Sequence, residues 1–280
     1  MTEVICRKVL EMQKTSLSWK AAGLSVGVVP TMGALHEGHL SLVAAAKQQC
    51  DRVIVTIFVN PTQFNNTEDL TRYPRTEAAD TALLASHAVD VIFAPAPEDV
   101  YPLGFASQVT VAGVADPLEG RFRPGHFAGV ATVVAKLFGM TLPDRAYFGE
   151  KDWQQVQVIA RMTADLNLNV ALQICATARA SDGMALSSRN ARLSPADRAI
   201  AGQLHPVMRA CAQDLIQGQA TAQIVAKAQK ALIGYGFEKI DYFTYCDEQS
   251  LVSLDHFAPN GRLLVAAWLS GVRLIDNVAV

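Results

Sequence analysis

Short hydrophobic runs alternate with helical patterns through the first two-thirds of the chain. The clearest run, Val-Ile-Val-Thr-Ile-Phe-Val at residues 53–59, is rich in β-branched residues and ends at Asn60-Pro61, which predicts a buried strand. Further strands are predicted at residues 24–29, 89–93, 146–148 and 170–175. Apolar residues spaced three and four apart predict helices at residues 38–49, 75–87, 129–139 and 152–166. This alternation predicts an α/β fold with a Rossmann-like parallel sheet and helices on both of its faces.

The pattern changes after about residue 190. Ser194-Pro195 is typical of a helix start, with Ser as the cap and Pro in the first turn, and we expect that helix to run to about residue 217. A second helix is predicted at residues 221–233, followed by strands at 240–246 and 262–269. We therefore expect two domains: a Rossmann-like domain over residues 1–180 and a smaller C-terminal α+β domain over residues 181–280, with a hinge near residues 181–190.

Composition narrows the kinds of molecule that the protein is expected to bind and the compartment in which it is expected to act. Lys and Arg number 24 and Asp and Glu 26, giving a net charge of −2, so the basic surplus typical of proteins that bind polymeric nucleic acid is missing. The five cysteines form no Cys-x-x-Cys pair, which suits buried thiols in a reducing compartment. The first residues lack the apolar run of a signal peptide, and the richest apolar stretch, residues 263–269, is too short to span a bilayer. We expect a cytoplasmic protein that binds neither membrane nor nucleic acid.

The first motif with candidate chemistry is Pro-Thr-Met-Gly-Ala-Leu-His-Glu-Gly-His at residues 30–39. It follows a predicted strand and opens a predicted helix, whose free N–H groups suit a phosphate. His36 and His39 are three residues apart, so one helical turn places both on one side, where they can donate hydrogen bonds to phosphate oxygens. The alternatives are two structural histidines or a zinc pair. No third ligand lies nearby in the sequence, and we expect no protein-bound metal site.

Two further motifs suit a small hydroxy acid. Asn-Pro-Thr-Gln at residues 60–63 ends the clearest strand, and the amide of Gln63 can both donate and accept hydrogen bonds; the alternative is an ordinary turn. Arg-Pro-Gly-His at residues 123–126 is a stiff loop that presents Arg123, which can pair with a carboxylate. The alternative for this loop is a plain surface segment.

The last two motifs suit the phosphates and ribose of a nucleotide. In Phe-Gly-Glu-Lys-Asp-Trp-Gln-Gln at residues 148–155, Lys151 offers a point charge, and Asp152 either binds ribose hydroxyls or caps the following helix. Gln155 lies one turn into that helix. Residues 181–190 carry Ser187, Ser188 and Arg189, which suit a departing pyrophosphate, although a polar linker has the same composition.

Together the five motifs, from about residue 28 to 190, closely resemble the pantoate–β-alanine ligase (pantothenate synthetase) family of the nucleotidylyltransferase superfamily, with a weaker match at residues 265–269 and 273–277. The resemblance implies an amide-forming, AMP-forming ligase that condenses (R)-pantoate with β-alanine through a pantoyl-adenylate and releases AMP and pyrophosphate. This reaction supplies a coenzyme A precursor. The resemblance also implies ATP as co-substrate, Mg²⁺, and a cytoplasmic homodimer whose smaller domain covers the active site.

The resemblance also assigns roles to residues of this chain. It implies catalytic roles for His39, His36 and Lys151, and pantoate binding by Gln63 and Gln155, to which the loop motif adds Arg123 as a candidate. It implies that ATP contacts Met32, Gly33, Ala34, Leu35, His36, Glu37, Gly38, His39, Gly149, Glu150, Lys151, Asp152, Ala178, Leu186, Ser187, Ser188 and Arg189. Ala178 fits because a backbone contact survives any side chain. Met184 and Trp153 depart mildly from the family pattern and remove no polar group that the chemistry needs.

Two other functions share some of these motifs. A nucleotidylyltransferase that moves AMP or CMP to a phosphate-bearing acceptor would share the His-x-x-His segment and the fold, but the motifs around Gln63 and Arg123 favour a carboxylic acid. A non-catalytic nucleotide-binding module would bind ATP without releasing pyrophosphate.

Overall fold

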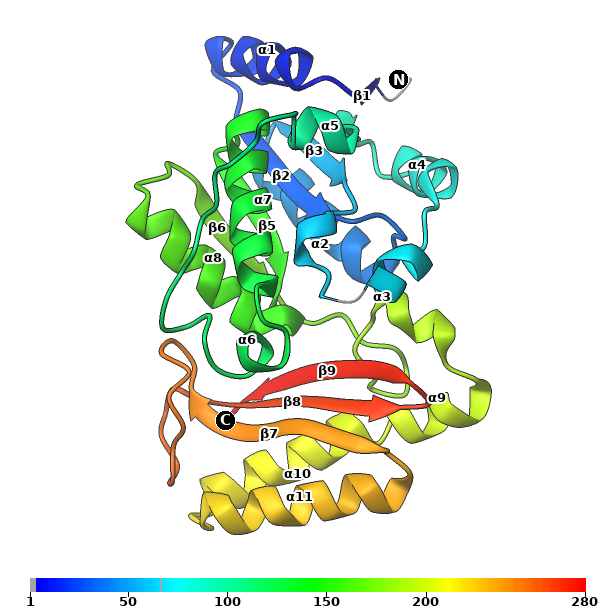
Figure 1. Cartoon of the computed structure of the whole chain (residues 1–280), viewed down its shortest axis with the longest axis vertical. Helices are drawn as coiled ribbons and strands as arrows, with labels where there is room; N and C mark the ends of the chain where they lie inside the picture. The colour runs from blue at the N-terminus through cyan, green and yellow to red at the C-terminus, as the bar shows by residue number, and fades with distance from the viewer. Residues whose placement is uncertain (1–3, 66) are drawn as a thin grey trace. The chain divides into compact units, whose positions relative to one another are not determined.

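The computed structural model describes residues 4–65 and 67–280, which form two compact units (Figure 1). The first unit comprises the residues up to Ala115 together with Glu119–Glu150 and Gln155–Ala176. The second comprises Asp116–Leu118, Lys151–Gln154 and Thr177–Val280. The turn that carries Lys151 therefore groups with the C-terminal part of the chain. The predicted domain division at residue 180 stays a prediction, because a compact unit is not by itself a domain that folds alone.

A six-stranded parallel sheet forms the centre of the first unit, in the order β1-β4-β3-β2-β5-β6. The strands are β1 (Val4–Cys6), β2 (Val26–Thr31), β3 (Arg52–Ile57), β4 (Val91–Phe93), β5 (Arg145–Gly149) and β6 (Ala171–Cys175). Strand β2 pairs with β3 on one side and β5 on the other, so the strand order reverses between β2 and β5. In such sheets ligands bind beyond the carboxyl ends of the strands at this reversal. The segments after Thr31 and Gly149 therefore lie where a ligand is expected.

Helices cover both faces of this sheet, which confirms the predicted Rossmann-like class. The helices in this part of the chain are α1 (Val9–Ala21), α2 (Glu37–Gln49), α3 (Thr67–Arg72), α4 (Glu77–Ala85), α5 (Pro97–Val100), α6 (Glu119–Phe122), α7 (His126–Thr141) and α8 (Trp153–Asp165), with 3₁₀ turns η1 (Pro61–Gln63) and η2 (Glu150–Asp152). Alternate strand residues face opposite sides. Val28 and Ile54 share a core with residues of α1, α7 and α8, whereas Val29 and Val55 share another with residues of α2 and α4.

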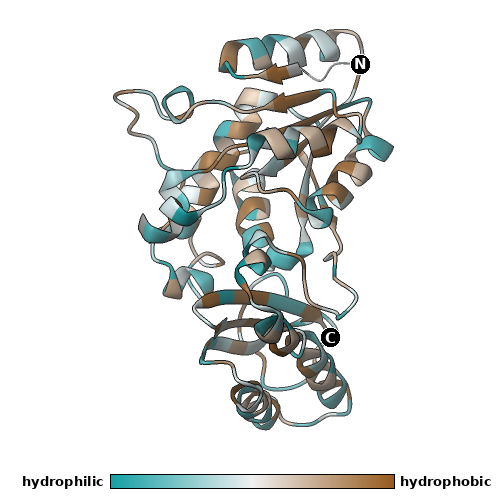
Figure 2. Ribbon diagram, turned by 90° about the vertical axis from the view of Figure 1, so that its right-hand side faces the viewer, coloured by the Kyte–Doolittle hydropathy of each residue, from teal (hydrophilic) through white to brown (hydrophobic). Residues whose placement is uncertain are grey.

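The second unit is built on an antiparallel sheet in the order β7-β8-β9. Its strands are β7 (Lys239–Asp247), β8 (Gly261–Leu269) and β9 (Val272–Ala279), and its helical segments are η3 (Ser188–Arg192), α9 (Pro195–Ala201), α10 (Leu204–Ile216) and α11 (Thr221–Tyr235). Met208 of α10, Ile224 of α11 and Val265 of β8 are fully or almost fully buried in one common core. Hydrophobic and hydrophilic residues alternate along these helices in Figure 2, as expected for helices with one buried face.

Some elements differ from the sequence predictions. The helix predicted from Pro195 to residue 217 is wrong as a continuous helix, because it is two helices interrupted at Gly202 and Gln203. Its start is confirmed: Ser194 Oγ accepts from the Asp197 N–H at 3.1 Å. The Gly202 N–H bonds to the Arg198 carbonyl and closes the first of the two helices. Strands β1 and β9 and helices α1, α3, α5 and α6 were not predicted.

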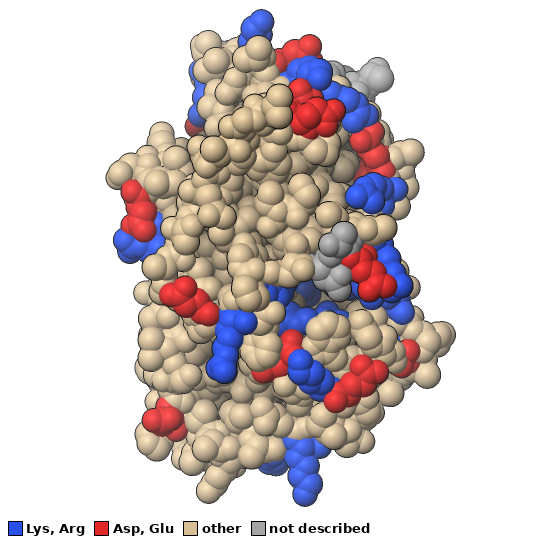
Figure 3. Space-filling model, viewed as in Figure 1, with Lys and Arg blue, Asp and Glu red and all other residues tan. Residues whose placement is uncertain are grey.

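Surface and membrane features are plain. Within residues 4–65 and 67–280, no helix is both long and apolar enough to cross a membrane. On the face drawn in Figure 3, basic and acidic side chains both occur and most atoms belong to uncharged residues. All five cysteines are free thiols, and four of them are buried; burial raises the pKa of Cys211 to about 11.

Candidate active site

The turn after β2 is a strained and well-supported loop. Gly33 and Ala34 both have positive φ angles, of 79° and 51°, a region that glycine adopts easily and alanine does not. Thr31, at the end of the strand, donates its hydroxyl to the Thr56 carbonyl at 2.6 Å, and the same oxygen accepts from the Gly33 N–H at 3.2 Å. Non-glycine residues at positive φ persist only where their surroundings hold them.

Asp80 of α4 supplies that support. Its carboxylate accepts from the backbone N–H of Ala34 at 2.9 Å and of Leu35 at 2.8 Å, while the Thr76 hydroxyl donates to it at 3.1 Å. The residue is 3% exposed, and a Cβ at position 33 would lie 3.1 Å from its Oδ2 atom. Sequence reasoning missed Asp80, which appeared only as one polar residue in a predicted helix. We assign it to positioning the turn.

His36 and His39 together cap the N-terminus of α2, because the ring of each accepts a hydrogen bond from a backbone N–H of this segment. His36 Nδ1 accepts from the Gly38 N–H at 3.1 Å, and His39 Nδ1 accepts from the His36 N–H at 3.3 Å. The ring centroids are 4.1 Å apart. A nitrogen that accepts carries no proton, so both neutral rings have their proton on Nε2. The cap therefore sets both histidines as Nε2–H donors beside a helix N-terminus, an arrangement suited to phosphate oxygens.

Gln63 lies beside the same turn. Asn60, 1% exposed, caps η1 by accepting from the Thr62 N–H at 3.3 Å and also accepts from the Tyr101 hydroxyl at 2.8 Å. Its amide donates to Gln63 Oε1 at 3.1 Å, and Gln63 Nε2 lies 2.9 Å from the sulfur of Met32. The predicted pantoate and ATP residues Gln63 and Met32 are thus in contact. The thioether is a weak acceptor, so the Gln63 amide loses little by turning to a stronger one.

Helix α7 packs against η1 without a gap. A Cβ at Gly129 would lie 2.4 Å from the Thr62 carbonyl oxygen and 2.8 Å from the Gln63 nitrogen, so only glycine fits there. Asn60 Nδ2 donates to the Gly129 carbonyl at 3.2 Å. These contacts fix the backbone that carries Gln63.

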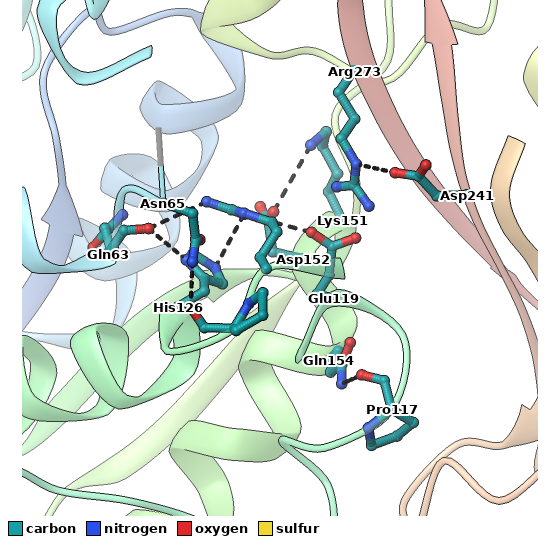
Figure 4. A network of polar contacts seen from close by, with 12 residues as sticks. Gln63, Asn65, Pro117, Glu119, His126, Lys151, Asp152, Gln154, Asp241 and Arg273 are labelled. Carbon is teal, nitrogen blue, oxygen red and sulfur yellow. Dashed lines mark hydrogen bonds and ion pairs between the residues drawn. The ribbon is translucent and has the colours of Figure 1, made fainter. Parts of the chain in front are cut away.

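Arg123 and His126 hold the same backbone through the Gln63 carbonyl; His126 and Gln63 are labelled in Figure 4. His126 Nδ1 lies 2.8 Å from the Gln63 carbonyl oxygen, and Arg123 donates to that oxygen at 3.3 Å. Arg123 also pairs with the buried Glu119 at 3.5 Å. These contacts make Arg123 part of the support of Gln63, and its predicted contact with substrate stays a prediction.

The turn after β5 carries Lys151 in the second unit. The Lys151 side chain is 17% exposed, and the Lys151 Nζ atom lies 3.9 Å from the carboxylate of Asp152 (Figure 4). The Lys151 carbonyl accepts from Asn277 of β9 at 2.9 Å, and the Trp153 indole donates to the Glu248 carbonyl at 2.7 Å. The turn is thus held by residues about a hundred positions further along the chain.

The neighbours of Lys151 divide between the two units. Gly149 and Glu150, predicted to contact ATP, end β5 and begin η2 in the first unit. Gln154, buried in the second unit, donates to the Pro117 carbonyl at 2.7 Å (Figure 4). Gln155, the predicted pantoate contact, is half-buried in the first turn of α8.

Residues 178–186 fold back on themselves in the second unit. The Leu186 N–H bonds to the Ala178 carbonyl at 2.9 Å, and Arg179 and Ala185 form an antiparallel bridge. Arg179 donates to both carboxylate oxygens of Asp276 at 2.7 and 2.9 Å, and the Asp276 side chain is 3% exposed. The predicted ATP contacts Ala178 and Leu186 thus share the base of one loop.

The remaining predicted loop residues lie at the tip of that segment. Ser187 Oγ accepts from the Arg189 N–H at 3.3 Å and caps η3, which begins at Ser188. Asn190 donates to the Ala185 carbonyl at 3.0 Å and ties the far side of the turn to its base. Ser187, Ser188 and Arg189 are therefore presented on a structured turn.

The predicted residues divide between the two units. The first unit holds residues 32–39, Gln63, Arg123, Gly149, Glu150 and Gln155, and the second holds Lys151, Asp152 and residues 178–189. Within the described ranges no three His, Cys, Asp or Glu side chains are arranged to hold a metal ion.

Comparison with known families gives one consistent result. The model of the family described as Pantoate-beta-alanine ligase matches residues 4–279. A pantothenate synthetase of Cereibacter sphaeroides is 58% identical over 276 residues, which are 99% of each chain. A pantothenate synthetase of Ruegeria pomeroyi is 55% identical over 280 residues, covering all of this chain and 98% of the relative.

Solved structures agree. The crystal structure of a pantothenate synthetase from Thermus thermophilus matches with a TM-score of 0.91 and 42% identity over 98% of both chains. A pantoate-beta-alanine ligase from Francisella tularensis, complexed with beta-gamma ATP and beta-alanine, matches with a TM-score of 0.84 and 36% identity over 99% of this chain and 97% of the other.

Proposed function

This chain belongs to the pantoate–β-alanine ligase family, and on that premise we propose that it condenses (R)-pantoate with β-alanine at the expense of ATP. The products are pantothenate, AMP and pyrophosphate, and the intermediate is a pantoyl-adenylate. The observation that carries the proposal is the reciprocal cap of His36 and His39, which presents two Nε2–H donors at the N-terminus of α2.

In the first step a carboxylate oxygen of pantoate attacks the α-phosphorus of ATP, and the bond to pyrophosphate breaks. Negative charge builds on the phosphate oxygens during this step. His39 and His36 stabilise that charge through Nε2–H, the N-terminus of α2 adds its dipole, and Lys151 adds a full positive charge. Mg²⁺ enters with the nucleotide and neutralises further phosphate charge. No covalent bond to the protein is needed.

Pantoate is held by amides. The side chain of Gln63 turns from the Met32 sulfur to the hydroxyl and carboxylate oxygens of pantoate, and Gln155 supplies a second amide. Arg123 acts on pantoate either directly or through the Gln63 backbone that it supports. The variant Arg123→Lys separates these two alternatives. If Arg123 contacts pantoate directly, the variant should raise the KM for pantoate and no other kinetic constant.

In the second step the neutral amine of β-alanine attacks the acyl carbon of the adenylate, and the bond from that carbon to the phosphate oxygen breaks to release AMP. Water attacks the same carbon readily, so it must be kept away. Leu186, Ser187, Ser188 and Arg189 serve this purpose by closing over the phosphates. Ala178 contributes only backbone to ATP, and Met32 to His39 with Gly149 to Asp152 contribute the remaining contacts.

Other properties follow from the family resemblance. We propose that the enzyme acts in the cytoplasm as a homodimer. Neither membrane nor nucleic acid is proposed as a partner.

The function is tested by product analysis. The protein is incubated with MgATP and pantoate, with and without β-alanine, and the products are identified by mass spectrometry. We expect pyrophosphate with pantoate alone, and AMP with pantothenate once β-alanine is present. A nucleotide-linked product from a phosphate-bearing acceptor would favour a nucleotidylyltransferase. Binding of ATP with no pyrophosphate release would favour a non-catalytic module.

A further inference from the structure

Strand β9 contains two adjacent buried polar residues, Asp276 and Asn277, each 4% exposed. Neighbouring strand residues face opposite sides of a sheet. Asp276 shares its face with Leu274 and Val278, which pack in the core of the second unit, and Asn277 lies on the other face. Burying polar groups inside a sheet is unfavourable unless each finds a partner, so the partners explain why these residues stand there.

Asn277 holds the turn that carries Lys151. Its Nδ2 donates to the Lys151 carbonyl at 2.9 Å, and its Oδ1 accepts from Arg262 at 2.5 Å. The Arg262 guanidinium in turn lies 3.6 Å above the ring of Trp153, two residues beyond Lys151. The turn is therefore attached to the antiparallel sheet in two ways, through the backbone carbonyl of Lys151 and through the side chain of Trp153.

Asp276 holds the base of the loop that carries Ser187. It accepts two hydrogen bonds from Arg179, at 2.7 and 2.9 Å, and Arg179 also donates to the Gly183 carbonyl at 3.1 Å. A bidentate pair between guanidinium and carboxylate fixes direction as well as distance. The Asn277 N–H donates to Asp276 Oδ1 at 2.8 Å, which couples the two anchors to each other.

We propose that Asp276 and Asn277 are positioning residues that hold Lys151 and the loop at residues 179–189 in one fixed relation, so that both meet the phosphates of ATP in the productive arrangement. This inference rests on the proposed function of Lys151 and Ser187. Asn277 acts through Lys151 and Asp276 acts through Arg179. Charged groups speed a reaction only when they are placed within about 1 Å of the productive position, so loosening either anchor should slow adenylate formation.

The sharpest variant is Asn277→Asp. It keeps the shape of the side chain and an oxygen that accepts from Arg262, but it removes the N–H that reaches the Lys151 carbonyl. We expect single-turnover pyrophosphate release with pantoate to fall about tenfold and the KM for ATP to rise. Asp276→Asn keeps one acceptor for Arg179 and is expected to act in the same direction with a smaller effect.

Tyr245→Phe is the matched control. The Tyr245 hydroxyl is buried in the same unit and makes two hydrogen bonds with the backbone of Ala258, at 3.0 and 2.9 Å. Its loss should lower the melting temperature without changing the rate of pyrophosphate release. If Tyr245→Phe slowed the reaction as much as Asn277→Asp at equal loss of melting temperature, the effect would be general destabilisation and the proposal would be wrong.

A double variant tests whether Asn277 acts through Lys151. If it does, Asn277→Asp causes no further loss of rate in a Lys151→Ala background, because coupled sites are not additive. Additive losses would overturn the proposal. Amide hydrogen exchange of residues 149–154 gives a readout without activity: protection should fall in Asn277→Asp and stay in Tyr245→Phe. If the wild-type protein released no pyrophosphate, the proposed function would fail, while unchanged exchange in Asn277→Asp would overturn the anchor itself.

Discussion

The turns after β2 and β5 are built in opposite ways, although both follow central strands of one sheet. The helix start after β2 is capped from within, because His39 Nδ1 accepts from the His36 N–H and His36 Nδ1 from the Gly38 N–H, while Asp80 holds the two N–H groups just before it. The turn after β5 is held from outside, because the Lys151 carbonyl bonds to Asn277, 126 residues further along the chain. The capping of the first helix start is therefore set by its own sequence, whereas the geometry of the second turn depends on another sheet.

This difference determines what fixes the position of the polar groups that each turn presents. A self-capped helix start is fixed whenever α2 is folded, so its Nε2–H donors are set before a ligand arrives. Lys151 is fixed to the second unit, together with the loop at residues 179–189. The donors of the first turn are set by the helix start itself, whereas the position of Lys151 is set within the second unit, which also carries Ser187. The predictions below probe the two turns, from the largest expected effect to the smallest.

Removing the imidazole of His39 tests the self-capped turn. His39→Ala deletes one phosphate donor and the acceptor for the His36 N–H, and we expect adenylate formation to fall about 10²–10³-fold while ATP still binds. Single-turnover pyrophosphate release with pantoate alone measures the rate. His87→Ala, which removes a histidine beyond the end of α4, is the control and should leave the rate unchanged. A near-normal rate in His39→Ala would remove this residue from the mechanism.

Removing the charge of Lys151 tests the turn that is held from outside. Lys151→Ala should slow adenylate formation about 100-fold and weaken ATP binding more than His39→Ala does, because a full charge is lost. Rates over a range of ATP concentrations separate the two effects. Lys47→Ala removes a lysine that pairs with Asp90 at 3.1 Å and serves as the control. An unchanged KM for ATP would mean that Lys151 does not meet the phosphates in the ground state.

Replacing Asp80 tests how far the first turn also depends on its support from α4. Asp80→Asn leaves one acceptor for the two N–H groups of Ala34 and Leu35, so stability should fall by about 1–3 kcal/mol and the KM for ATP should rise about tenfold. Urea unfolding and steady-state kinetics measure the two changes. Asp90→Asn is the control, since Asp90 accepts from the Val53 N–H at 2.9 Å before β4 begins. If both variants lost stability but kept the KM, Asp80 would be structural only.

The smallest effect concerns the pH dependence of the second unit. Burial and the positive charge of Arg179 lower the pKa of His205 below 6.5, against the opposing effect of Asp276. Below pH 6.5 the unfolded chain therefore binds more protons than the folded one, and stability falls as the pH falls. His205→Gln should reduce this loss between pH 7.5 and 5.5, measured by thermal melting.

His256→Gln provides the control for that experiment, because His256 is exposed. The charged groups that act on His205 are Arg179, Asp276 and Arg209, and all three stay in the variant. If the melting temperature of His205→Gln fell with pH as steeply as that of the wild-type protein, the His205 ring would titrate alike in the folded and unfolded chain, which would contradict the prediction.

The sequence was sufficient for the parts of the fold whose signals are local. Strands β2, β3 and β4 are runs rich in Val and Ile that contain or are soon followed by a proline, and the segment at residues 30–39 contains both of its capping histidines. Strand β9 was missed because Asp276 and Asn277 are disfavoured in strands, and the partners that make them acceptable are distant in sequence. Asp80 was missed for the same reason, since nothing near it in sequence shows that α4 lies against Ala34 and Leu35.

Transfer of oxygen between the substrates is the most direct test of the central claim, that the acid is activated by attack on the α-phosphorus. Pantoate labelled with ¹⁸O in both carboxylate oxygens is incubated with the enzyme, MgATP and β-alanine, and the products are analysed by mass spectrometry. We expect one ¹⁸O in the phosphate of AMP and the other in the amide carbonyl of pantothenate. Unlabelled AMP, or label in inorganic phosphate alongside ADP, would contradict it.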